Sequence, residues 1–166
     1  MIPASEVIKL LNLQPNNVEG GYFANVYPLP GTGEKPCSAI YYFLEKGDRS
    51  LMHKVSSDML YHFYQGDPVE MLLLYPEGYE PRTEVCIFSN DLAAGGHPMK
   101  VIPGGTWLGS RPLNGGAWAL MGVSMAPPFN PDDYFIGNRD KLIAKYPERA
   151  QMITELTRPV SGSKNS

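Results

Sequence analysis

The chain has 166 residues, a length that suits one domain with a single hydrophobic core. Its 14 basic and 17 acidic side chains give a formal net charge of −3, which excludes the strongly basic surface typical of nucleic-acid binding. No apolar run is long enough to span a bilayer, and the first residues do not resemble a signal peptide. We therefore expect a soluble, cytoplasmic protein without nucleic-acid or membrane partners.

Residues 3–13 are predicted to form a short helix, because Pro3 and Ser5 are typical of a helix start and apolar residues follow near helical spacing. After Gly20-Gly21 the pattern changes to short aromatic, β-branched and apolar runs separated by turn residues. Eight such runs are predicted as strands: 21–28, 39–44, 59–64, 69–75, 83–88, 100–102, 106–110 and 117–124. So many short strands in one small domain predict an all-β jelly roll or barrel.

The helical spacing of apolar residues returns over 138–157, where Pro147 is predicted to interrupt the helix. Residues 159–166 are mostly small and polar, with little that can pack against a core. We therefore expect one domain over 1–158, with helices at both ends, followed by a flexible tail.

The segment from Gly47 to Gly66 resembles the first metal-binding motif of the cupins. That motif consists of a glycine, five residues, H-x-H, three or four residues, a glutamate, six residues and a glycine. His53 matches the first histidine, whereas Val55 and Met59 replace the second histidine and the glutamate. The frame of the motif is present, but most of its ligands are missing.

The second cupin motif, P-x-G-x-x-H, is similar to residues 103–108, and there Leu108 stands at the ligand position. Of the four motif ligands only His53 remains, and protein metal sites normally use about three side-chain ligands. We therefore expect no metal and no cofactor. Carboxylates such as Glu70, recruited from elsewhere, remain an alternative source of ligands.

Six blocks in the same order resemble the DUF985 branch of the cupins, also called cupin-5, over residues from about 5 to 157. The blocks are Glu19-Gly20-Gly21-Tyr22-Phe23, residues 39–44, residues 57–68, residues 101–107, residues 122–127 and Gly137-Asn138-Arg139. The resemblance implies a double-stranded β-helix, the cupin jelly-roll barrel, often paired into homodimers. It also implies structural similarity to metal-free sugar-nucleotide epimerases, in a family without one settled activity.

The chain departs from the family pattern in three segments. Residues 24–27 lack the usual arginine and glutamate, Met59 replaces a glutamate, and Leu108 replaces a glutamine. These replacements predict a cavity lined for a less polar ligand than the family norm.

His53 is the first candidate for chemistry, because imidazole can donate or accept a proton near neutral pH. Tyr61 and Tyr41 are the next candidates, since a phenol can donate to a developing oxyanion or relay a proton. A hydrogen-bonded core histidine and ordinary tyrosine packing are the alternatives. The residues expected to contact the substrate and shape the pocket are Met59, Phe63, Val55, Trp107, Leu108, Tyr22 and Asn25.

Three functions remain open at this point. The leading hypothesis is a metal-independent enzyme that isomerises, epimerises, eliminates or cyclises a small, partly apolar molecule inside the barrel. The second is a binding protein of the same fold that keeps the cavity as a ligand pocket. The third is a metal-dependent oxygenase with an unusual ligand set. In each case we expect a small-molecule ligand and a homodimer.

Overall fold

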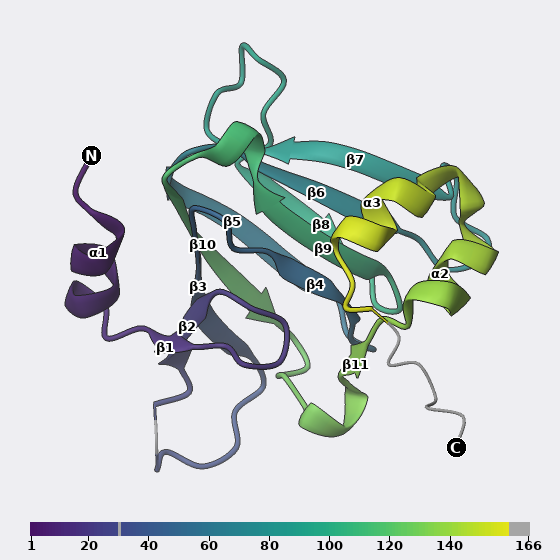
Figure 1. The fold of residues 1–166 in the computed structure, drawn as a ribbon. Helices are drawn as coiled ribbons and strands as arrows, with labels where there is room; N and C mark the ends of the chain where they lie inside the picture. The colour runs from purple at the N-terminus through teal and green to yellow at the C-terminus, as the bar shows by residue number, and fades with distance from the viewer. Residues whose placement is uncertain (30, 160–166) are drawn as a thin grey trace, which may run out of the picture.

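The computed structural model describes residues 1–29 and 31–159, so most of the predicted tail, 160–166, lies outside the described residues. Two antiparallel sheets face each other and enclose the core (Figure 1). The six-stranded sheet has the order β1 (Gln14–Pro15), β2 (Tyr22–Tyr27), β3 (Ser38–Glu45), β10 (Trp118–Met125), β5 (Met59–Gly66), β8 (Met99–Ile102). The five-stranded sheet has the order β11 (Phe135–Ile136), β4 (Ser50–Lys54), β9 (Trp107–Pro112), β6 (Val69–Leu74), β7 (Thr83–Phe88). This arrangement confirms the predicted all-β cupin barrel.

All eight predicted strands are present with small shifts at their ends, and β4 is a strand that the sequence pattern did not predict. Its first four residues, Ser50 to His53, are all buried. Both faces of β4 are covered, so its sequence lacks the alternation of a half-exposed strand. This unpredicted strand carries His53.

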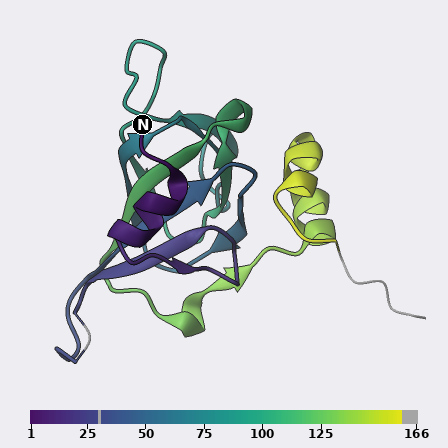
Figure 2. The ribbon, with the colours of Figure 1, turned by 60° about the vertical axis from the view of Figure 1, so that its left-hand side comes forward.

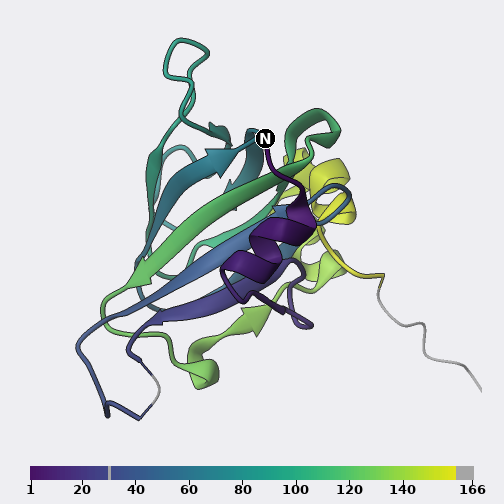
Figure 3. The ribbon, with the colours of Figure 1, turned by 90° about the vertical axis from the view of Figure 1, so that its left-hand side faces the viewer.

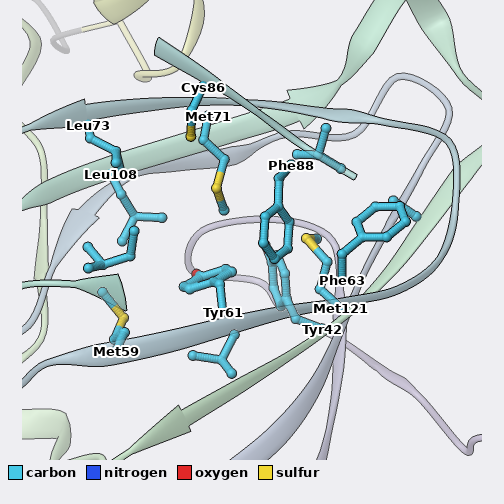
Figure 4. Packing of buried hydrophobic residues seen from close by; sticks show 14 of the residues in the cluster. Tyr42, Met59, Tyr61, Phe63, Met71, Leu73, Cys86, Phe88, Leu108 and Met121 are labelled. Atoms are coloured by element: carbon cyan, nitrogen blue, oxygen red, sulfur yellow. The ribbon is translucent and has the colours of Figure 1, made fainter. Parts of the chain in front are cut away.

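The main core lies between the two sheets. It combines side chains of the six-stranded sheet, such as Phe63 and Met121, with side chains of the other sheet, such as Met71 and Phe88 (Figure 4). The Phe63 and Phe88 rings meet edge to face, with centroids 5.6 Å apart. Edge-to-face pairs of this kind contribute about 1 kcal/mol beyond burial, so this end of the barrel interior is filled by packing.

The helices cover the outer faces of the sheets. Helix α1 (Ala4–Leu10) buries Val7 against Phe43 and Trp118 of the six-stranded sheet. Figure 3 shows α1 lying across that sheet, and Figure 2 shows the C-terminal helices on the opposite side of the barrel. No helix within the described residues is long and apolar enough to cross a membrane.

The C-terminal segment forms α2 (Arg139–Lys145) and α3 (Ala150–Glu155), separated by a 3-10 turn at Pro147–Arg149. The predicted interruption at Pro147 is therefore confirmed. Both helices pack against the outward side of the five-stranded sheet, where Met52 of β4 is fully buried. This packing covers the outer face of β4 and leaves His53 on the inner one.

Candidate functional site

His53 lies near the end of β4 with only 3% of its surface exposed. Its Nδ1 atom is 2.7 Å from the Leu51 carbonyl oxygen. Because a carbonyl oxygen can only accept, Nδ1 carries the proton of this hydrogen bond. The other nitrogen, Nε2, faces the Glu19 carboxylate, with 3.3 Å between Nε2 and Oε2. Both ring nitrogens therefore have partners in the protein, and a proton on Nε2 can be shared with Glu19.

Glu19 is 6% exposed and precedes β2 in a loop that closely approaches β4. The Leu51 backbone N–H donates to the Glu19 carbonyl oxygen at 2.8 Å, which ties the loop to the strand. Gly20 adopts a positive φ of 105°, and a Cβ there would lie 2.3 Å from the Arg49 carbonyl oxygen. Only glycine fits this close approach. The Glu-Gly pair thus places a carboxylate beside the histidine.

Tyr134 holds the carboxylate from the other side. It follows the short 3-10 helix η2 (Pro131–Asp133), and its hydroxyl donates to Glu19 Oε2 at 2.5 Å. Its ring lies 5.5 Å from the His53 ring, tilted by 31°. Burial, and then the Glu19 charge, raise the pKa of Tyr134 far above its usual value. Tyr134 therefore stays protonated and remains a donor.

Two further phenols reach the same place. The Tyr42 hydroxyl donates to the Gly20 carbonyl oxygen at 2.6 Å. Burial, followed by the Glu19 charge, raises the pKa of both Tyr42 and Tyr61 well above the usual value. Among the described residues, the Tyr61 hydroxyl has no hydrogen-bond partner, so it can donate to a ligand.

These groups surround an inner cavity of about 70 Å³. Its lining is otherwise mostly apolar, and the full lining is Glu19, Ile40, Tyr42, His53, Val55, Met59, Tyr61, Val123, Met125, Phe129 and Tyr134. An outer pocket of about 900 Å³ adjoins it. Four residues line both spaces, namely Ile40, Val123, Met125 and Phe129. A ligand in the outer pocket can therefore extend one end toward His53.

Several predicted site residues come together here. Val55, Met59 and Tyr61 line the inner cavity with His53. Asn25 lines the outer pocket instead. The site therefore has a polar inner end and a mostly apolar approach.

Tyr41 is not in the cavity, which corrects its expected position. It lies on the outward face of β3, where its ring meets that of Tyr64 with centroids 6.1 Å apart. Its neighbour Tyr42 occupies the inward position. Alternation along β3 allows only one of these adjacent tyrosines to face the barrel.

Four expected pocket residues also lie elsewhere. Phe63 and Leu108 are buried in the barrel core but line neither space. Trp107 lies under the Lys54 ammonium group, 4.9 Å from its ring centroid. Tyr22 donates to Glu45 at 3.0 Å on the outer side of the sheet. Their positions correct the expectation that they shape the pocket.

Sequence reasoning missed Glu19, Tyr42 and Tyr134 as site residues. Glu19 is the first residue of the first block that resembles the family, and this was the only sign of its importance in the sequence. The sequence did not show which residue Glu19 contacts. Tyr134 lies in a loop after the last long strand, where periodicity carries no information about facing. Its role follows from tertiary contacts with Glu19 and His53.

The residues present do not fit the usual cupin metal site. Val55 and Met59 at the motif positions offer no strong ligand atom, and Leu108 lies in the apolar core. Within the part of the chain that the structure describes, no three His, Cys, Asp or Glu side chains gather into a metal-binding group. His53 and Glu19 supply two donors, fewer than the about three that protein sites normally use.

The chain belongs to the cupin superfamily branch Cupin_5, or DUF985, whose family model matches residues 5–136. This superfamily includes both enzymes and non-catalytic proteins.

Solved structures agree with this family. A protein from Shewanella oneidensis is similar with a TM-score of 0.84 and 29% identity, covering 96% of this chain and 100% of that chain. A hypothetical protein from Leishmania major has a TM-score of 0.83 and 20% identity, and the match covers 95% of this chain and 100% of that chain. Oxalate decarboxylase from Bacillus subtilis shares only the fold, with a TM-score of 0.55 and 14% identity. The match covers 92% of this chain and 41% of that chain. No curated protein matches the chain significantly.

Proposed function

We propose that the protein is an enzyme that moves a proton on a small, partly apolar molecule without a metal. The outcome would be an isomerisation, epimerisation, elimination or cyclisation. The observation that carries this proposal is the buried pair of His53 and Glu19 at the inner end of an apolar cavity. Paired titratable groups inside a dry cavity are the usual components of acid and base catalysis.

The roles follow from the hydrogen bonds. The Leu51 carbonyl fixes the ring orientation of His53, so Nε2 points to the cavity side where Glu19 lies. His53 and Glu19 would act as one unit that takes up and returns the substrate proton, because Nε2 faces the Glu19 carboxylate while Nδ1 is bound to the Leu51 carbonyl oxygen. The Tyr61 hydroxyl, which stays protonated, would donate to the oxygen on which negative charge develops.

The test uses solvent deuterium, because it does not require a known substrate. The protein is incubated with a metabolite extract in D₂O, and mass spectrometry follows compounds that gain one deuterium or change in amount. We expect at least one such compound with the wild type and a loss of about 100-fold or more with His53→Ala. Turnover that survives in a folded His53→Ala variant would refute the role of His53.

A non-catalytic binding protein is the second candidate. The larger pocket favours it, because most of its side chains are apolar and its volume suits a drug-sized ligand. In that case His53→Ala changes ligand affinity only, and no compound in the extract gains deuterium.

The homodimer and the cytoplasmic location also remain proposals. Met99 and Val101 of β8 stay about half exposed on an outward face, which supports pairing with a second copy. Cys37 and Cys86 are both free, which supports a reducing compartment. Light scattering of the purified protein measures its oligomeric state, and fractionation of the source cells measures its location.

A further inference from the structure

We propose that the inner cavity binds the uncharged, oxygen-bearing end of the substrate, a carbonyl or hydroxyl group, while an apolar body fills the outer pocket. This names the substrate class of the proposed function and rests on it. Four properties of the site carry the inference: the volume of the cavity, its charge, its free donor and its continuity with the outer pocket.

The volume limits what can enter. A benzene ring fits an apolar cavity of about 150 Å³. The inner cavity, with about 70 Å³, has about half that volume, so it accepts the oxygen-bearing end of a ligand but not a whole ring. Any larger part of the ligand must remain outside.

The charge excludes an anionic end. A ligand carboxylate in this cavity would lie beside the buried Glu19 carboxylate, and like charges repel strongly where burial limits screening by water. His53 and Tyr134 already engage Glu19 Oε2, so the cavity has no unengaged cation to offset a second negative charge.

The free donor favours an oxygen, and desolvation disfavours a cationic end. An ammonium group that enters the cavity gives up its hydrogen bonds to water, and Glu19 Oε2, the oxygen that would pair with it, already faces His53 Nε2 and accepts from the Tyr134 hydroxyl. The Tyr61 hydroxyl is a protonated donor without a partner among the described residues. A carbonyl or hydroxyl oxygen accepts one such hydrogen bond and carries no charge that must be desolvated.

The outer pocket holds the rest of the molecule. It adjoins the inner cavity along Ile40, Val123, Met125 and Phe129, all of them apolar. A chain or ring that leaves the oxygen-bearing end therefore enters an apolar passage first. Charged groups of the outer pocket, Glu34, Lys35 and Asp133, belong to its lining only and do not line the inner cavity.

Methionine methyl NMR distinguishes binding in the two spaces. Met59 lines the inner cavity only, Met125 lines both spaces, and Met71 is a core residue that serves as a control. Protein labelled with ¹³C in the methionine methyl groups is titrated at pH 7 with 2-octanone, 2-octanol, octanoate and octylamine. These probes share an apolar body and differ in the charge and chemistry of one end.

We expect 2-octanone and 2-octanol to shift the Met59 and Met125 signals, and octanoate and octylamine to bind at least about tenfold more weakly. Tyr61→Phe should weaken the binding of 2-octanone by about fivefold, because it removes one hydrogen bond. Tyr41→Phe is the matched control, because this neighbouring tyrosine lies outside the cavity. An unchanged Met71 signal shows that each variant is folded.

Three results would overturn the inference: shifts of Met125 without Met59, equal or tighter binding of a charged probe, or no effect of Tyr61→Phe. Absence of binding by both neutral probes would overturn it as well. The readout is binding and not turnover, so a failure of the proposed catalysis would leave these shifts unchanged and remain distinguishable.

Discussion

The backbone of Leu51 holds both His53 and Glu19: its N–H donates to the Glu19 carbonyl oxygen, and its carbonyl accepts from His53 Nδ1. One residue of β4 thus fixes the loop that carries the carboxylate and the orientation of the imidazole. The resulting 3.3 Å between Nε2 and Oε2 depends on rigid strand geometry. Such preorganisation is what a proton-transfer pair requires.

Glu19→Gln should separate the role of the charge from that of the shape. Glutamine keeps the size of the side chain, but it cannot stabilise a protonated His53 ring. We expect turnover of an identified substrate to fall about 100-fold or more while the fold is retained. The measurement is the pH dependence of kcat, together with ¹⁵N spectra that report the protonation of the His53 ring nitrogens.

The control for this variant is Glu6→Gln, a matched change on the exposed surface of α1. It should leave both turnover and the histidine spectra unchanged. If Glu19→Gln behaved like the control, Glu19 would be a buried structural residue only.

Metal removal should have no effect. The motif positions Val55, Met59 and Leu108 lack ligand atoms of the usual kind, so we expect far less than one metal ion per chain. Elemental mass spectrometry of untagged protein purified without chelator gives the metal content. EDTA should change neither the midpoint of thermal unfolding nor turnover. About one bound iron, manganese or zinc per chain would make a metal-dependent reaction, including oxygenase chemistry, the leading account.

The edges of the two sheets are joined by an ion pair that should make stability depend on acid pH. Lys100 Nζ of β8 lies 2.6 Å from Glu84 Oε1 of β7, and the Tyr75 hydroxyl donates to Oε2 of the same carboxylate at 2.7 Å. Burial alone would raise the pKa of Glu84, but these hydrogen bonds outweigh it and lower that pKa. The resulting stabilisation is present above the unfolded pKa of about 4.3 and is lost as pH falls through the lower folded value.

Glu84→Gln should therefore reduce the free energy of unfolding by about 1 kcal/mol at pH 7, since the pair is partly exposed. The difference from wild type should shrink as the pH falls from about 5 to about 3. Urea unfolding at several pH values measures it. A difference that stays constant across this range would mean that the ion pair contributes nothing.

Two buried tyrosines and one partly buried tyrosine determine the expected behaviour at alkaline pH. Burial, and then Glu19, raise the pKa of Tyr42, Tyr61 and Tyr134, so folding is favoured by their neutral forms. This stabilisation is fully present below the unfolded pKa of about 10 and is lost as pH rises above it. Absorbance at 295 nm should therefore show a group of tyrosines that ionises only when circular dichroism reports unfolding. Ionisation of all ten tyrosines before unfolding would contradict their burial.

Much of the fold was predictable because it depends on local patterns. The eight predicted strands are present, and the interruption at Pro147 follows from a residue that cannot continue a helix. Alternation along β5 puts Tyr61 on the same inward face as Met59, since Met59, Tyr61 and Phe63 are buried and the residues between them are less buried. The spacing of the cupin motif from Gly47 to Gly66 also indicated that His53 lies on a barrel strand.

Other features were decided only by tertiary structure. Strand β3 is apolar on both faces, so the sequence could not show that Tyr42 rather than Tyr41 faces the cavity. Strand β4 is buried on both faces, so the sequence could not show that Ser50–Lys54 is a strand. Glu19 and Tyr134 come from loops far apart in the chain, and no local period relates them. Their meeting with His53 depends on the closing of the barrel, in which long-range backbone hydrogen bonds bring one carboxylate against one imidazole.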